Sequence, residues 1–72
     1  LDTRSRILQA ALDVFAARGF DAATIREITS RVGLSHGLVK YHFKNKDALW
    51  RDAIRFMFDR VRPSMQLTVD ET

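Results

Sequence analysis

The sequence contains no cysteine, one proline and three glycines in 72 residues. Without cysteine, disulfide bonds and thiolate metal sites are excluded. No apolar run approaches the roughly 20 residues that a membrane-spanning helix needs, and no signal peptide is visible. We therefore expect a soluble, cytoplasmic protein with no membrane partner.

Sequence signatures of catalysis are missing as well. There is no Ser-His-Asp or Cys-His set, no pair of carboxylates and no glycine-rich phosphate loop. The two histidines, His36 and His42, are six positions apart and do not share a helix face, so a metal pair is not expected. We expect a protein that is not an enzyme and that has no metal site or cofactor.

A chain of 72 residues can hold one small domain. A domain of this size buries only about 60% of the surface that its unfolded chain exposes, which leaves it marginally stable. Because disulfides are excluded and a structural zinc site is not expected, we expect further chain or a second subunit to supply the missing stability. The sequence starts without methionine and ends at no recognisable boundary, which favours a truncated chain.

Positive charge is concentrated in one window of the sequence. Residues 26–46 carry five basic side chains against Glu27 alone, a net charge of +4, while the whole chain has +3. A clustered basic patch is typical of proteins that bind a polyanion. Charge alone does not distinguish such a patch from a solvated basic surface.

Every strong periodic pattern is helical, and the predicted fold class is all-α. Apolar residues recur at three- and four-residue steps over about residues 3–18, which predicts an amphipathic first helix. Gly19 is placed to end it as a left-handed cap, with Phe20 folded back on Phe15. No strand pattern is present.

Two further helices are predicted on either side of a tight turn. Thr24 and Glu27 form the capping box that opens the second helix, which stops at Gly33. Ser35 is a good N-cap for a short third helix that ends near residues 42–43. The three helices together predict a homeodomain-like head.

A fourth helix is predicted from Lys46 to about Arg62, with Asn45 as its cap and Pro63 as its end. Apolar residues surround more of it than one stripe, so it needs partners on two sides. The head can cover one side. We expect the other side to be an exposed apolar patch that packs on an absent C-terminal domain or a second subunit. Residues 64–72 have no clear pattern.

Residues 24–43 fit a helix-turn-helix unit, in which two helices cross through a short turn that often contains glycine. Gly33 supplies a residue that tolerates positive φ, and Ile28 and Val39 supply inward apolar side chains. Thr29 stands where the close approach of the helices favours alanine. We expect its hydroxyl to bond back to the carbonyl four residues earlier.

The second helix of such a unit lies in the DNA major groove. Residues facing away from Val39 are then the candidate readers of bases: Ser35, His36, Gly37, Leu38, Lys40 and Tyr41. Glycine inside a helix costs about 0.8–1 kcal/mol relative to alanine, which fits a backbone that approaches a surface closely. An outward leucine fits contact with a thymine methyl group. The alternative is a short helix with a polar, solvated face.

Two helix N-termini are candidate phosphate sites. Lys46 begins the fourth helix, where a cation opposes the helix dipole, so a bound anion would explain its position. The alternative is a long, solvated lysine. Thr24 could offer its hydroxyl or nearby amides to phosphate while capping the second helix, and His42 is expected to bond backbone or phosphate.

The stretch GLSHGLVKYHFKNKDAL at residues 33–49 resembles the recognition-helix signature of the tetracycline-repressor (TetR) family. Upstream residues also fall where that family's pattern expects them: Ile7, Leu8, Ala11, Phe15, Gly19, Thr24 and Ile28. The resemblance covers residues 3–58. It departs at Lys40, where the family most often has tyrosine, and at Leu38, where a small hydroxyl residue is common.

This resemblance implies a DNA-binding head over residues 1–45, followed at 46–72 by a connecting helix and the start of a C-terminal domain. In that family the C-terminal domain dimerises and binds a small effector, which releases the operator DNA. By position, the phosphate contacts would be Thr24, Tyr41 and Lys46. The groove contacts would be His36, Gly37, Leu38 and Lys40.

The predicted function is a nucleoid-associated transcriptional regulator, a dimer that binds a palindromic operator and is a repressor in the common case. The alternative is a small helical protein-interaction module whose basic face meets an acidic protein. Such a module would show no DNA affinity above the loose binding of any basic protein.

Overall fold

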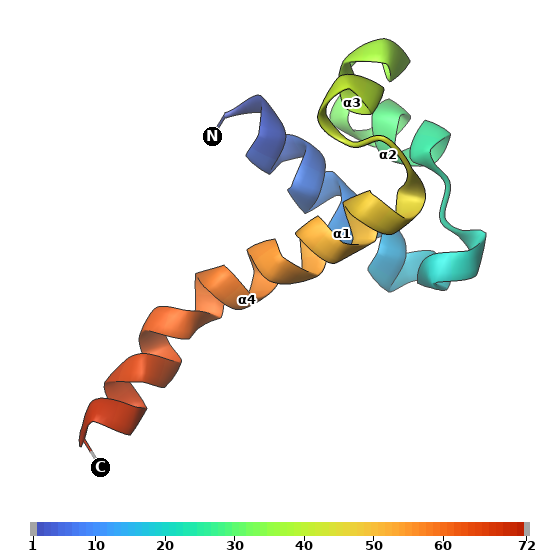
Figure 1. The fold of residues 1–72 in the computed structure, drawn as a ribbon. Helices are drawn as coiled ribbons and strands as arrows, with labels where there is room; N and C mark the ends of the chain where they lie inside the picture. The colour runs from blue at the N-terminus through green and yellow to red at the C-terminus, as the bar shows by residue number, and fades with distance from the viewer. Residues whose placement is uncertain (1, 72) are drawn as a thin grey trace.

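The computed structural model describes the backbone of residues 2–71 and the side chains of residues 2–61. Four helices follow one another along this part of the chain: α1 (Thr3–Ala22), α2 (Ile25–Val32), α3 (His36–His42) and α4 (Lys46–Glu71). The described residues contain no strand, so the predicted all-α class is confirmed. Helices α1–α3 form a head, from which α4 projects as a long arm (Figure 1).

Helix α1 is longer than predicted and has a break near its end. Gly19 adopts φ 81° and ψ 167°, outside the left-handed helical region that we predicted, and in a region that essentially only glycine occupies. Phe20 nevertheless lies back against Phe15, with 6.0 Å between ring centroids, as predicted. The chain then continues through a short helical turn to Ala22, and the Ala23 amide donates to the Gly19 carbonyl at 3.2 Å.

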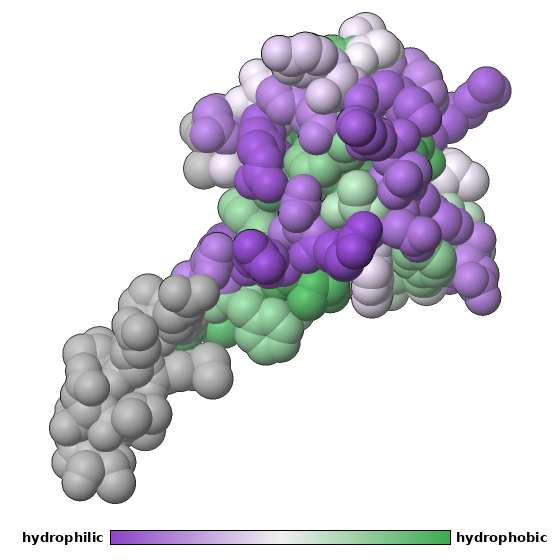
Figure 2. Space-filling view, in the orientation of Figure 1, coloured by the Kyte–Doolittle hydropathy of each residue, from purple (hydrophilic) through white to green (hydrophobic). Residues whose placement is uncertain are grey.

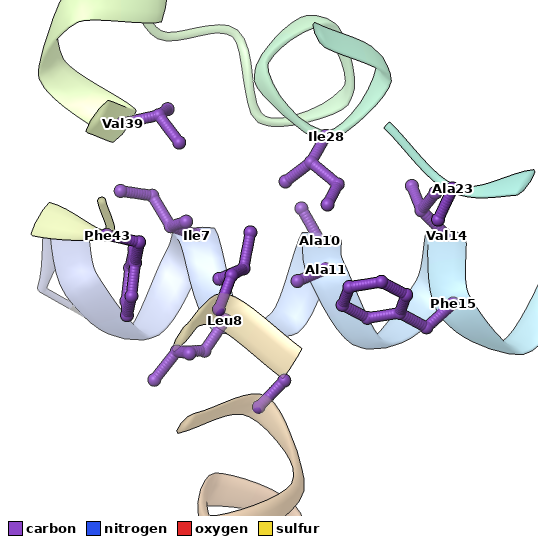
Figure 3. Packing of buried hydrophobic residues seen from close by; sticks show 12 residues of the cluster. Ile7, Leu8, Ala10, Ala11, Val14, Phe15, Ala23, Ile28, Val39 and Phe43 are labelled. Atoms are coloured by element: carbon purple, nitrogen blue, oxygen red, sulfur yellow. The ribbon is translucent and has the colours of Figure 1, made fainter. Parts of the chain in front are cut away.

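The core is built on one face of α1. That helix buries Ile7, Leu8, Ala10, Ala11, Val14 and Phe15. Ile28 from α2 and Val39 from α3 point onto this face, and both are fully buried, as predicted (Figure 3). Leu49 and Ala53 of α4 complete the cluster. Burying a side chain of this size contributes about 1.5–3 kcal/mol relative to leaving it exposed, so most of the stability of the head comes from this layer.

Helix α4 does not end where we predicted. It runs on through Pro63 to Glu71, so the prediction that Pro63 closes it near Arg62 was wrong, and residues 64–71 are helical. A proline inside a helix removes one backbone hydrogen bond and costs about 3 kcal/mol. This cost does not prevent the helix from continuing, because the neighbouring residues keep their own hydrogen bonds.

The expected exposed apolar patch lies on α4. Met57, Phe58 and Val61 are 40%, 54% and 45% exposed. Beside them, α1 and α4 enclose an apolar groove of about 320 Å³ whose lining includes Leu12, Phe15, Ala16, Trp50, Ile54 and Met57. Figure 2 shows apolar surface (green, lower centre) where α4 leaves the head, while polar surface dominates the upper part of the view.

Candidate nucleic-acid interface

The turn between α2 and α3 is set by Gly33. This residue has φ 78° and ψ 26°, the left-handed conformation that the sequence predicts, and its amide donates to the Thr29 carbonyl at 3.0 Å. Val32 and Leu34, on either side of the glycine, both pack against the core cluster. The turn therefore holds α2 and α3 in a defined crossing, which is the geometry of a helix-turn-helix unit.

Side-chain caps begin both helices of this unit. The Glu27 amide donates to Thr24 Oγ1 at 3.0 Å, and the Leu38 amide donates to Ser35 Oγ at 3.1 Å. The second half of the predicted capping box is absent, because the Glu27 carboxylate instead accepts from Arg18 Nε at 2.6 Å. This hydrogen bond raises the pKa of Arg18 and ties the end of α1 to the start of α2.

The outward side of α3 is open to a partner. The six residues predicted to face away from Val39 are all exposed: Ser35, His36, Gly37, Leu38, Lys40 and Tyr41. The Tyr41 side chain is 82% exposed. Within the part of the chain that the structure describes, the side chains of His36 and Lys40 make no hydrogen bond or ion pair, so their donors are available. The ring of His42 is half-buried and lies 5.4 Å from that of Tyr41.

Gly37 has no packing reason to be glycine. It lies inside α3, and a Cβ added to it would meet nothing within 4 Å. Since alanine is the better helix former by about 0.8–1 kcal/mol, neither the backbone nor the neighbours of this residue explain its identity. A close approach by a second molecule would explain it.

Thr29 departs from our prediction. Thr29 is 8% exposed, and its hydroxyl is buried without a hydrogen-bond partner among the described residues. The expected bond to the carbonyl of Ile25 is therefore wrong. An unpaired buried hydroxyl costs about 1–3 kcal/mol, so this residue weakens the α2 face that packs on the core.

Lys46 has partners that the sequence did not reveal. Its Nζ donates to the carbonyl oxygens of Phe20, Asp21 and Ala23 at 2.8, 3.2 and 3.1 Å. It also lies 4.5 Å from the centroid of the Phe20 ring. We call these three oxygens the carbonyl cradle. The side chain therefore reaches the negative end of α1, which compensates its charge at the start of α4.

The basic window of residues 26–46 divides into two kinds of cation. Arg31 pairs with Asp13 at 3.7 Å, and Lys46 occupies the carbonyl cradle. Arg26, Lys40 and Lys44 are exposed and, within the described part of the chain, have no partner. We did not assign Arg26 or Lys44 to the site, although their charge contributed to the signal.

No group of three or more His, Cys, Asp or Glu residues that could hold a metal ion is found among the described residues. In the same part of the chain, no helix has the length and apolar character required to cross a bilayer.

Comparison with known proteins gives the same fold and motif. Residues 7–53 match the family model described as bacterial regulatory proteins, tetR family. The chain is 40% identical over 55 residues to the uncharacterized HTH-type transcriptional regulator YerO of Bacillus subtilis, covering 76% of this chain and 19% of that protein. It is 50% identical over 48 residues to the HTH-type transcriptional repressor Rv3405c of Mycobacterium tuberculosis, covering 67% of this chain and 26% of that protein.

A third relative is the HTH-type transcriptional repressor KstR2 of Mycolicibacterium smegmatis, which is 36% identical over 56 residues, 78% of this chain and 27% of that protein. The chain thus spans only about a fifth to a third of the length of the curated relatives it matches. No solved structure matches the chain significantly.

Proposed function

Because this chain belongs to the TetR family of bacterial regulatory proteins, we propose that it is the DNA-reading head of a sequence-specific transcriptional repressor. Residues 1–45 are the head, and residues 46–72 are the connecting helix and the start of a second domain. The observation that carries this proposal is the open outward side of α3. The side chains of His36 and Lys40 are exposed there without a hydrogen bond or ion pair in the described part of the chain, and Gly37 has free space around it.

In this proposal α3 lies in the major groove and reads base edges through Ser35, His36, Gly37, Leu38 and Lys40. The exposed Lys40 ammonium can donate to the O6 and N7 acceptors of guanine, and the exposed Leu38 side chain can contact a thymine methyl group. Gly37 allows the helix backbone to approach the bases. Val39, fully buried on the opposite side, fixes which residues face the groove.

Phosphate contacts position the head on the duplex. We assign them to Thr24 at the start of α2, to the exposed hydroxyl of Tyr41 and to His42. Free amides and the dipole at the start of α2 favour an anion there. The unpaired cations Arg26 and Lys44 strengthen the attraction to DNA. Lys46 is left out of this set because its ammonium already has three partners.

The complete protein acts as a dimer in this proposal, with two recognition helices about 34–36 Å apart in successive major grooves of a palindromic operator. The apolar groove between α1 and α4 and the exposed patch on α4 would pack on the C-terminal domain, which dimerises and binds a small effector. Two of the relatives are named repressors. A regulator of this kind acts in the cytoplasm, on the nucleoid.

The proposal is tested with the full-length protein and a random-sequence duplex library. Repeated enrichment on the wild-type protein should yield a palindrome that is bound in the presence of non-specific competitor DNA. Lys40→Ala should then weaken binding by about 1–3 kcal/mol and relax the preference at one base pair. Lys44→Ala is the matched control, because loss of an exposed lysine outside the reading face should weaken binding equally on all sequences.

Failure of the library to converge, together with loose binding that competitor abolishes, would contradict the proposal. That result would favour a module whose basic face binds an acidic protein.

A further inference from the structure

The carbonyl cradle joins the start of α4 to the C-terminal end of α1. We propose that Lys46 is a positioning residue for DNA recognition and not a phosphate contact: it holds the junction between α3 and α4 against the C-terminal end of α1. This inference rests on the proposed function, because its consequence is the placement of α3 on DNA.

The Lys46 ammonium has no donor left for phosphate. A lysine ammonium carries three N–H groups and no acceptor. Three carbonyl oxygens lie within 2.8–3.2 Å of Nζ, and the bonds to Phe20 and Ala23 are partly buried. The Phe20 ring lies 4.5 Å away and adds a cation–π contact. Binding a phosphate would require at least one of these contacts to be given up.

The cradle exists because α1 is interrupted at Gly19. The last carbonyls of a helix have no intrahelical donor and carry the negative end of the helix dipole. The extended, positive-φ conformation of Gly19 breaks the helix just before the carbonyls of Phe20, Asp21 and Ala23. A cation from another helix can therefore satisfy all three, and Lys46 comes from a position 23 to 26 residues away in the sequence.

Aromatic packing also attaches the start of α4 to the end of α1. Trp50 lies one turn after Lys46 on α4, and its ring is 5.5 Å from that of Phe20 and 4.9 Å from that of Phe15. Phe20 is thus in contact with both Lys46 and Trp50. The start of α4 is attached to the end of α1 by one polar and one aromatic contact.

Helix α3 depends on this attachment more than the other helices do. It has seven residues and buries only Val39, whereas α1 buries six residues. Only residues 43–45 separate the end of α3 from Lys46. Fixing Lys46 therefore fixes the C-terminal end of α3, while the Gly33 turn fixes its start. Releasing Lys46 would allow α3 to tilt, and base contacts are sensitive to such tilting.

The two roles of Lys46 predict different dependences on salt. Loss of one phosphate contact lowers the magnitude of the slope of log K against log[salt] by about 0.9, and weakens binding to specific and random DNA alike. Loss of a positioning residue weakens binding to the operator but leaves the slope and the affinity for random DNA unchanged. The ratio of the two affinities therefore separates the roles.

The experiment uses full-length Lys46→Met, which keeps most of the side-chain length and removes the donors and the charge. Lys44→Met is the matched charge control, since Lys44 is exposed and has no partner in the described part of the chain. Val14→Ala is the stability control, because it removes buried methyl groups from the core of α1 but none of the hydrogen bonds of the cradle. The probes are the palindrome enriched by the wild-type protein and a random duplex of equal length. Far-UV circular dichroism checks that every variant is folded at the temperature of measurement.

We expect Lys46→Met to bind the palindrome roughly 5- to 150-fold more weakly than wild type, the range for losing one base contact. Its slope and its binding to the random duplex should equal those of wild type. Val14→Ala should bind both probes like wild type, which shows that lower stability alone does not have this effect.

A slope reduced by about 0.9 with equal weakening on both probes would make Lys46 a phosphate contact and overturn the inference. Unchanged binding to the palindrome, or an equal loss in Val14→Ala, would also overturn it. If the wild-type protein enriches no palindrome, the proposed function itself fails and the inference fails with it.

Discussion

The helix-turn-helix unit contains two pairs of similar residues, two aromatic residues and two glycines, whose members have different environments. Phe43 is 1% exposed and belongs to the core, while Tyr41, two positions earlier, is 82% exposed. Gly33 has a conformation that favours glycine, while Gly37 has ordinary helical geometry with free space around it. Phe43 is explained by the packing of this chain, and Gly33 is explained by the backbone conformation of the turn. Nothing within the chain explains the exposed Tyr41 ring or the glycine at position 37, whereas a partner would, and this difference supports the proposed reading face.

The largest effect is expected when Phe43 and Tyr41 are replaced by alanine, each in a separate variant. Phe43→Ala should lower the free energy of unfolding by about 3–5 kcal/mol, because it leaves a cavity beneath α3. Tyr41→Ala should change that free energy by less than about 0.5 kcal/mol, because the ring is exposed, yet it should weaken DNA binding. Urea unfolding and DNA titration measure the two effects. Equal destabilisation by both variants would contradict the comparison.

Replacing Gly33 or Gly37 by alanine should change the stability of the head in opposite directions. Gly33→Ala should destabilise the head by about 1–2 kcal/mol, because an L-residue is strained at φ 78°. Gly37→Ala should stabilise it by up to about 1 kcal/mol, since a Cβ meets nothing and alanine is the better helix former. We expect Gly37→Ala to bind DNA more weakly despite its higher melting temperature. Unimpaired DNA binding in this variant would contradict the assignment of Gly37 to the reading face.

The smallest test compares two threonines of the same unit. Thr29→Val should stabilise the head by about 1 kcal/mol, because it removes an unpaired buried hydroxyl without changing the shape of the side chain. Thr24→Val should destabilise it by a similar amount, about 1 kcal/mol, through loss of the cap to the Glu27 amide. Thermal unfolding of the two variants beside wild type measures both. A loss of stability in Thr29→Val would mean that its hydroxyl has a partner in solution.

The sequence by itself determined the local features of this protein. The side chains of Thr24, Ser35 and Asn45 each accept from a backbone amide at a helix start, the last from the Ala48 amide at 2.8 Å, although the second half of the capping box at Thr24 is missing. The turn at Gly33 and the burial of Val39 also follow the prediction. The caps and the turn depend on residues within four positions of one another, and the helical period places Val39 on the inward side, so the spacing of residue types in the chain contains the information. The exposure of the reading face follows from the same helical period.

Only the tertiary structure decided how side chains from distant positions meet. Lys46 finds its carbonyls 23 to 26 residues away, and Arg18 takes the Glu27 carboxylate that the predicted capping box would have used. Thr29 is left without a partner by the way α2 packs. Such contacts depend on the crossing of helices and on which competing partner lies nearest. No periodicity or local spacing encodes that choice, because it is settled by the free energy of the whole packed arrangement.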